Sequence, residues 1–130
     1  MILLDTHIWY RWVDEQAKLT PKQMQHLQDN EPTGLGVSVI SCWEIAKLVS
    51  LGRLTLGRPL PDWMTMALTF RGCQLLDLTP EIAIDANQLP GTFHRDPADQ
   101  ILVGTARVLG ISMLTADARI LAYPHMNLLV

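Results

Sequence analysis

The sequence predicts an α/β protein, a three-layer α/β/α sandwich around a central, mainly parallel sheet. Short apolar runs alternate with longer segments of helical spacing along the chain, and this alternation favours a parallel sheet with helices on both faces. The chain has 130 residues, of which 48% are hydrophobic and 18% charged. A chain of that size can bury about two-thirds of its unfolded surface, so we expect one compact domain over residues 1–130.

The apolar runs are expected to form strands because turn or capping residues bound each of them. The expected strands cover residues 1–4, 34–40, 74–78, 111–114 and, at the edge of the sheet, 127–130. The intervening segments are expected to form helices over residues 8–13, from residue 21 onward, and over 41–52, 59–70, 80–89, 97–109 and 117–121.

Several helix starts are marked by a capping residue followed by proline. Thr20, Thr79 and Asp96 each precede a proline, and the side chain of such a residue accepts a hydrogen bond while the fixed φ of proline suits the first turn. Ser41 is followed three residues later by Glu44, which is the spacing of a capping box. We therefore expect Ser41 to cap the third helix.

Composition narrows the class of protein. The formal net charge is −3, which argues against broad nucleic-acid binding by a basic surface. The two cysteines, Cys42 and Cys73, lie among apolar residues and are expected to be buried thiols rather than a disulfide. The first residues carry no basic segment, and no apolar run approaches the about 20 residues of a membrane span. These features predict a cytoplasmic protein without a membrane segment.

Acidic side chains follow the ends of strands or open helices in four separated motifs. Their carboxylates belong to Asp5, Glu44, Asp96, Asp99 and Asp117. Because parallel strands end on one rim of the sheet, we expect these acids to converge there. Two carboxylates about 4 Å apart repel by roughly 4 kcal/mol at an effective dielectric near 20. A hard divalent cation, which prefers carboxylate ligands, would relieve that repulsion.

Each acid also has a purely structural interpretation. Asp5, Asp96 and Asp117 can cap the helices that follow them, Glu44 can complete the capping box, and Asp99 suits the first helical turn. His94 and Arg95 are either exposed loop residues or phosphate contacts, and Trp43 and Ile45 are expected in the core. The sequence contains no CxxC, HExxH, GxSxG or P-loop motif, and its four histidines have no metal-ligand spacing.

Four segments together resemble a known family. They are LLDTH, SCWEIAKLVSLGRL, FHRDPADQILVGTAR and LTADARIL, and they cover the chain from Leu3 to about Tyr123. In order and spacing they resemble the PIN-domain family, and more narrowly the VapC-like ribonuclease toxins of bacterial type II toxin–antitoxin modules. The resemblance implies an α/β/α sandwich, an acidic pocket that binds Mg²⁺ or Mn²⁺, endoribonuclease activity and inhibition by a cognate antitoxin.

Position by position, the resemblance assigns Asp5, Glu44, Asp99 and Asp117 as the four acids of the family, with Asp96 as an additional acid. Thr6 and Thr115 match small hydroxyl residues that flank the site in similar proteins. Two positions depart from the pattern: Gln100 stands where many similar sequences have Arg, and Gly104 where they often have Ala. A helical glycine costs roughly 1 kcal/mol relative to Ala.

These residues suggest metal-assisted hydrolysis of an RNA phosphodiester. Asp5, Asp99 and Asp117 are expected to hold Mg²⁺, directly or through water. Glu44 and Asp96 are expected to orient waters or help bind a second ion. The candidates for contacting the RNA backbone are Arg95, Lys47 and Arg11.

Two other functions compete with this hypothesis. A phosphatase with an aspartyl nucleophile also begins with an acid after a strand, but such enzymes have a DxD start and this chain has His7 at the third position. The other competing function is that of a metal-binding module without catalytic activity, such as a receiver-like module. A receiver would have a Lys after its last strand, and this chain has no obvious one.

We expect a homodimer. The apolar stretch 63–70 is either core or the surface for a second copy or an antitoxin.

Overall fold

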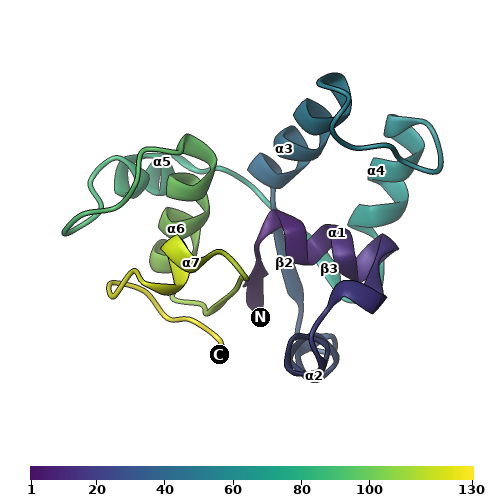
Figure 1. Ribbon diagram of the computed structural model, residues 1–130. Coiled ribbons are helices and arrows are strands. Elements are labelled where there is room, and N and C mark those ends of the chain that lie inside the picture. Colours follow the sequence, from purple (N-terminus) through teal and green to yellow (C-terminus); the bar gives the residue numbers. More distant parts are fainter.

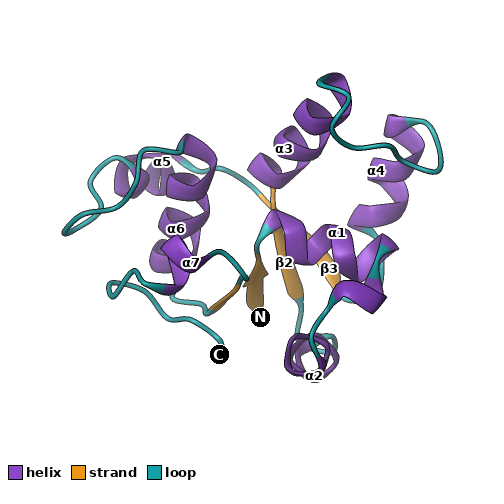
Figure 2. Ribbon diagram, in the orientation of Figure 1, coloured by secondary structure: helices purple, strands orange, loops and turns teal.

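The computed structural model describes residues 1–130 and shows a four-stranded, fully parallel sheet (Figure 2). Its strands are β1 (Ile2–Leu4), β2 (Leu35–Ser38), β3 (Cys73–Leu76) and β4 (Met113–Leu114). Their order across the sheet is β3-β2-β1-β4, and all neighbouring pairs are parallel. The expected strands and the parallel sheet are therefore confirmed, except that residues 39–40 already belong to the following helix and residues 127–130 form no strand.

Helices cover both faces of this sheet (Figure 1). They are α1 (Thr6–Asp14), α2 (Pro21–Asn30), α3 (Val39–Ser50), α4 (Leu60–Leu68), α5 (Pro80–Ala86), α6 (Pro97–Leu109) and α7 (Ala118–Leu121), with one 3₁₀ turn over Gln16–Lys18. In Figure 1, α1, α3 and α4 lie on one side of the sheet and α5, α6 and α7 on the other. The predicted sandwich is confirmed. None of the helices combines the length and apolar character needed to span a bilayer.

The side chains of β1 alternate between two hydrophobic cores. Ile2 and Leu4 belong to one core and Leu3 to the other, as expected for a strand that is buried on both faces. The first core also contains the buried indoles of Trp9, Trp12 and Trp63, and the second contains Leu102, Met113 and Tyr123. The short β1 strand is thus fixed on both faces, and the residue that follows it has a defined position.

The predicted N-caps at Thr20, Thr79 and Asp96 are confirmed, but the prediction for Ser41 is wrong. Helix α3 begins at Val39, and Ser38 caps it by accepting a hydrogen bond from Ile40 N at 3.1 Å. Because β2 ends directly in this cap, the helix starts before Ser41 is reached. Ser41 is fully buried and its hydroxyl is used elsewhere, as described below.

Residues 127–130 do not form the expected edge strand. They make a single parallel bridge between Leu128 and Met113, with hydrogen bonds from Met113 N to Asn127 O and from Leu129 N to Met113 O, each 3.0 Å long. The neighbouring strand β4 has only two residues, so it offers too short a ladder for a fifth strand.

Most of the remaining apolar residues lie where they were expected. Trp63 is buried, and Met64, Met66, Leu68 and Phe70 pack against the same core, so this stretch is core rather than an open docking surface. Both cysteines are free thiols, as expected, but each is only half-buried, and this burial raises the pKa of Cys73 to about 12. Trp43 is the exception, because 57% of it is exposed whereas Ile45 is buried.

The departure at Gly104 is explained by helix packing. A Cβ atom at this position would lie 3.0 Å from the backbone N of Ala86 and 3.1 Å from its Cβ. Helices α5 and α6 therefore approach so closely at Gly104 that an Ala side chain would require them to shift by a few tenths of an ångström. Close packing between the helices offsets the lower helix propensity of glycine.

Candidate active site

The first acid lies at the point where the strand order reverses. The chain runs outward from β1 to β2 and β3 and then crosses to β4 on the other side of β1, and ligands of open α/β sheets bind outside the strand ends at such a point. Asp5 follows β1 directly, and Thr115 follows β4. The Thr115 hydroxyl donates to Asp5 Oδ2 at 2.6 Å, and Thr6 N donates to Asp5 Oδ1 at 2.7 Å. Asp5 also caps α1, as the structural interpretation of this residue predicts.

Glu44 reaches the same rim from α3. The hydroxyl of Thr6 donates to Glu44 Oε1 at 2.5 Å and lies 2.7 Å from Ser41 Oγ. The Glu44 carboxylate thus contacts α1 and does not close a capping box on its own helix. Burial raises the pKa of Glu44 to about 7, and the charges of Asp5, Asp99 and Asp96 add to that shift.

Asp96 and Asp99 open helix α6. Asp96 caps the helix by accepting from Asp99 N at 3.1 Å, while the Asp99 side chain is 11% exposed and lies 2.6 Å from His94 Nε2 in a hydrogen bond. Burial raises the pKa of Asp99 despite this bond, and the charges of Asp96 and Asp5 act in the same direction. Burial likewise raises the pKa of Asp5.

Asp117 completes the cluster beyond β4. It caps α7 by accepting from Arg119 N at 2.8 Å, and its own backbone N donates to the Thr115 hydroxyl at 3.0 Å. Burial alone would raise the pKa of Asp117, but the hydrogen bonds and charge of Arg119 lower it. Arg119 Nη2 lies 3.2 Å from Asp117 Oδ2 and 3.6 Å from Asp99 Oδ2, so one guanidinium bridges the two acids.

The five acids from four distant motifs are therefore near enough to perturb one another. Charge interactions connect Glu44 with Asp5, Asp96 and Asp99, and Asp5 with Asp117. The donor set consists of carboxylate oxygens, which are the ligands that Mg²⁺ and Mn²⁺ prefer. Burial, together with the charges of neighbouring acids, raises the pKa of Asp5, Glu44 and Asp99, and a bound cation would favour their charged forms. The residues thus fit a hard divalent cation by their chemistry. No three His, Cys, Asp or Glu side chains are arranged as a ready-made metal site.

Sequence reasoning missed three contributors to this cluster. The sequence leaves His94 open between a loop residue and a phosphate contact, gives no indication of a role for Arg119, and predicts a cap at Ser41. Both His94 and Arg119 stand within the motifs that contain Asp99 and Asp117, so nearness to an acid was the available signal. Gln100, the departure from the expected Arg, donates to His94 O at 3.2 Å and so helps hold the segment before α6.

The candidate RNA contacts come from three segments, which are α1, α3 and the loop before α6. Arg95 and Lys47 are exposed. Arg11 lines a cavity of about 290 Å³ between α1 and α3, together with His7, Lys18 and Arg53. These basic groups are separate positions and do not form one continuous site.

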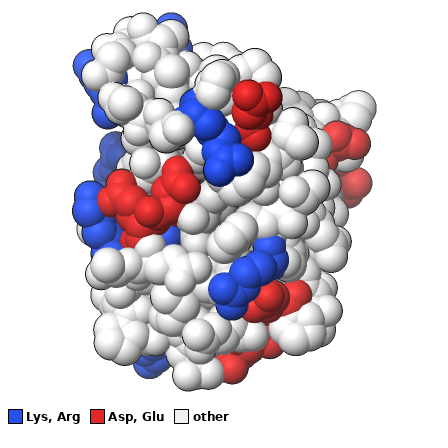
Figure 3. Space-filling model, turned by 90° about the vertical axis from the view of Figure 1, so that its right-hand side faces the viewer, with Lys and Arg blue, Asp and Glu red and all other residues white.

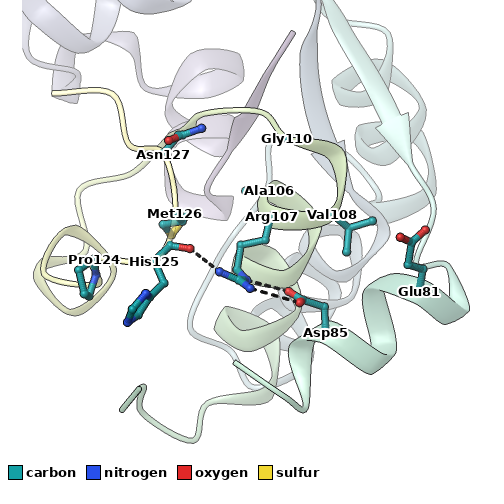
Figure 4. A pocket seen from close by; sticks show the side chains of 10 residues that line it. All are labelled: Glu81, Asp85, Ala106, Arg107, Val108, Gly110, Pro124, His125, Met126 and Asn127. Atoms are coloured by element: carbon teal, nitrogen blue, oxygen red, sulfur yellow. Dashed lines mark hydrogen bonds and ion pairs between the residues drawn. The ribbon is translucent and has the colours of Figure 1, made fainter. Parts of the chain in front are cut away.

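The largest cavity of the chain is not at the acids. It measures about 580 Å³ and lies between α5, the end of α6 and residues 124–127 (Figure 4). Arg107 crosses it, with Nε 2.9 Å from Asp85 Oδ2 and Nη1 2.5 Å from His125 O. Since these bonds satisfy Arg107 and tie the C-terminal segment to two helices, we interpret this cavity as structural.

Comparison with known proteins agrees with this geometry. The PIN domain family matches residues 2–125. The chain belongs to the PIN domain family. It is 31% identical to Ribonuclease VapC22 of Mycobacterium tuberculosis (strain ATCC 25618 / H37Rv) over 124 residues, which cover 95% of this chain and 92% of that protein. Within the family the chain is thus VapC-like.

Solved structures show the same PIN fold. VapBC2 from Rickettsia felis, bound to a DNA fragment from its promoter, aligns with a TM-score of 0.71 at 14% identity and covers 99% of this chain and 98% of that one. A toxin–antitoxin complex from Klebsiella pneumoniae aligns with a TM-score of 0.69 at 17% identity, covering 100% and 97%. At such low identity these structures establish the fold and no more.

Proposed function

We propose that this VapC-like PIN protein is a metal-dependent endoribonuclease, the toxin of a type II toxin–antitoxin module. The observation that carries the proposal is the convergence of Asp5, Glu44, Asp96, Asp99 and Asp117 at the rim of the sheet, with burial and mutual charge raising the pKa of three of them. The likeness to a ribonuclease supports the choice of RNA.

In this proposal Asp5, Asp99 and Asp117 hold Mg²⁺ or Mn²⁺, and Glu44 and Asp96 position water. A bound divalent cation lowers the pKa of water and stabilises negative charge on phosphate. Thr115 orients Asp5, and Thr6 orients Glu44, through the hydrogen bonds described above. Arg119 neutralises Asp99 and Asp117 and therefore competes with a cation for these carboxylates.

RNA binding in this proposal is local. On the face shown in Figure 3, acidic and basic side chains lie interspersed among uncharged ones instead of forming a basic band. Arg95 directly precedes Asp96, and Lys47 lies one helical turn after Glu44 on α3. These two groups and Arg11 are the proposed, separate phosphate contacts. A cognate antitoxin is the proposed protein partner because the solved structures with this fold include toxin–antitoxin complexes, and a homodimer is the proposed assembly.

The test is cleavage of a defined transfer RNA pool by the purified protein. We expect cleavage with Mg²⁺ or Mn²⁺, none with EDTA, and recovery when the metal is restored. Metal binding without cleavage of several RNAs would instead support a non-catalytic module. Hydrolysis of a small phosphate ester with RNA left intact would support the phosphatase.

The role of Asp96 can be separated from its cap. Asp96→Ala is expected to lower the free energy of unfolding by about 1 kcal/mol because the α6 cap is lost, whereas Asp96→Ser keeps a capping oxygen. If the charge supports catalysis, both variants should lower cleavage by about 10- to 100-fold, the range for groups that orient metal ligands. Urea unfolding and single-turnover cleavage measure the two effects. Wild-type cleavage by the Ser variant would remove Asp96 from the site.

The metal-free protein is expected to lose stability as the pH rises from about 4.5 to about 7. Burial raises the pKa of Glu44 from 4.5 to about 7, so within this window the folded protein retains a proton that the unfolded chain has released. Thermal unfolding in EDTA measures this loss. Adding Mg²⁺ should restore stability more at pH 8 than at pH 5, because protons compete with the metal.

Glu44→Gln provides the matching variant, since its amide oxygen still accepts from Thr6. Glu44→Gln should flatten the pH dependence of the stability, while Glu81→Gln, at an exposed position in the first turn of α5, should not. Equal pH dependence in the wild type and Glu44→Gln would show that Glu44 is not the titrating group.

A further inference from the structure

Trp43 differs from every other aromatic side chain of the protein. The indoles of Trp9, Trp12 and Trp63 are at most 1% exposed, and each donates its Nε1–H to an acceptor. All other Trp, Tyr and Phe rings pack against another ring. Trp43 is 57% exposed and has neither an indole hydrogen bond nor a ring partner. Burial in the core therefore does not account for this large apolar side chain.

The Trp43 ring borders a cavity that includes part of the acidic cluster. This cavity of about 380 Å³ lies between the starts of α3 and α6, and its lining residues are Ile40, Trp43, Glu44, Asp96, Pro97 and Ala98. Cavities of about 300–1,000 Å³ accommodate small organic groups. The indole of Trp43, Ile40 and the smaller Pro97 and Ala98 form its apolar walls, and two of the five acids stand at its border. Whatever occupies it lies directly beside the candidate active site.

These properties favour a planar base over a phosphate. The carboxylates of Glu44 and Asp96 repel phosphate but accept hydrogen bonds from the amino groups of bases. Aromatic side chains are the usual platforms for unpaired bases in single-stranded RNA. Lys47 follows Trp43 by one helical turn on the same face of α3; it is exposed and forms no ion pair, so a phosphate can be held next to a stacked base.

We propose that Trp43 and the adjoining cavity form a base-binding subsite that stacks one unpaired nucleobase of the RNA beside the cleaved bond. This inference rests on the proposed ribonuclease function and adds a positioning residue and a substrate requirement to it. Base stacking is sequence-tolerant, so the subsite selects single-stranded RNA and not a particular base.

Binding can be tested without cleavage. A mixed-sequence, single-stranded oligoribonucleotide is titrated into the full-length Asp5→Asn protein in EDTA while tryptophan fluorescence is recorded. Because the other three indoles are buried, quenching reports on Trp43. Trp43→Ala and Trp43→Leu should bind about 5- to 100-fold more weakly, as expected for the loss of one stacked base. The affinity for labelled RNA, measured by fluorescence anisotropy, should recover in Trp43→Phe. Leu51→Ala is the control, because Leu51 is an exposed apolar residue at the end of the same helix, and its affinity should match that of the Asp5→Asn protein.

Cleavage and abasic substrates distinguish stacking from a structural role. In otherwise wild-type protein with Mg²⁺, Trp43→Ala should raise KM with little change in kcat, since stacking stabilises the substrate and the transition state alike. An RNA with one abasic position should bind the protein that retains Trp43 more weakly than the intact RNA does. Trp43→Ala should bind the abasic and the intact RNA equally well. Unchanged KM and binding in Trp43→Ala would overturn the inference, and so would full activity of Trp43→Leu.

The outcomes also separate this subsite from the proposed function. If the wild-type protein cleaves no RNA with any divalent metal, the proposed function fails. If it cleaves RNA and Trp43→Ala does so with the same KM, only the subsite fails. If Trp43→Ala alters the sedimentation coefficient or inhibition by the antitoxin while RNA binding is unchanged, the cavity is a protein-docking surface and the inference is wrong.

Discussion

Asp5→Asn is expected to lower RNA cleavage by about 10²–10³-fold or more while the protein remains folded. The substitution removes a charge from the proposed metal ligands, and electrostatic stabilisation by a bound metal is worth several kcal/mol, at about 1.36 kcal/mol per tenfold in rate. Single-turnover cleavage of the transfer RNA pool at saturating Mg²⁺ measures the loss. Weaker Mg²⁺ binding, measured by calorimetry, should accompany it.

The fold should tolerate this change because asparagine can replace each hydrogen bond of Asp5. Asn is as good an N-cap as Asp, and its Oδ1 can accept from Thr6 N. Its amide can donate to the Thr115 hydroxyl, which has a second lone pair for Asp117 N. Since burial disfavours the charged Asp5, the metal-free variant should be as stable as the wild type or more stable.

Asp29→Asn is the matched control. Asp29 lies near the end of α2, which is at the opposite end of the sheet from α3 in Figure 1, and it accepts from Gln25 Nε2 at 2.7 Å. Its substitution removes the same charge outside the acidic cluster, so cleavage should be unchanged. If Asp5→Asn unfolds the protein and Mg²⁺ does not restore it, capping of α1 is the dominant role of Asp5.

The fold and the position of the acids follow from local patterns. Leu3 and its neighbours form an apolar run too short for a helix, and Thr20, Thr79 and Asp96 each stand before a proline, so strand ends and helix starts were visible in the sequence. Parallel strands end on one rim, and this geometric rule predicted that Asp5 and Asp117 approach each other. In the structure one hydroxyl joins the two residues, since Thr115 contacts both Asp5 Oδ2 and Asp117 N.

The wrong predictions arise where a local pattern has two solutions. Ser41 and Glu44 have capping-box spacing, but Ser38 caps the helix first, and the true partner of Glu44 is Thr6, 38 residues earlier. Trp43 was expected in the core with Ile45, but the two residues are two positions apart on α3 and lie on nearly opposite faces of the helix, so Ile45 is buried and Trp43 is exposed. Contacts such as that of Glu44 with Thr6 depend on how α1 and α3 meet, which no local spacing encodes.

The second large effect is expected for Thr115→Val, which should lower the free energy of unfolding by about 2–4 kcal/mol. The Thr115 side chain is buried, and its hydroxyl serves both Asp5 Oδ2 and Asp117 N. Valine has nearly the same shape but leaves the buried Asp5 Oδ2 without its donor, at about 1–3 kcal/mol, and removes a second hydrogen bond at the partly buried Asp117 N, at about 1 kcal/mol. Urea unfolding in EDTA measures the loss.

Cleavage should fall by about 10- to 100-fold in the same variant, because Thr115 orients a proposed metal ligand. Thr115→Ser keeps the hydroxyl and should retain most activity. Thr105→Val is the control for the substitution itself: Thr105 is equally buried, but it only donates to Ile101 O one turn back along α6, a carbonyl already bonded within the helix. If Thr105→Val destabilises the protein as much as Thr115→Val, the loss reflects hydroxyl burial in general. If Thr115→Val cleaves RNA at the wild-type rate, the bond that joins β4 to Asp5 serves the fold alone.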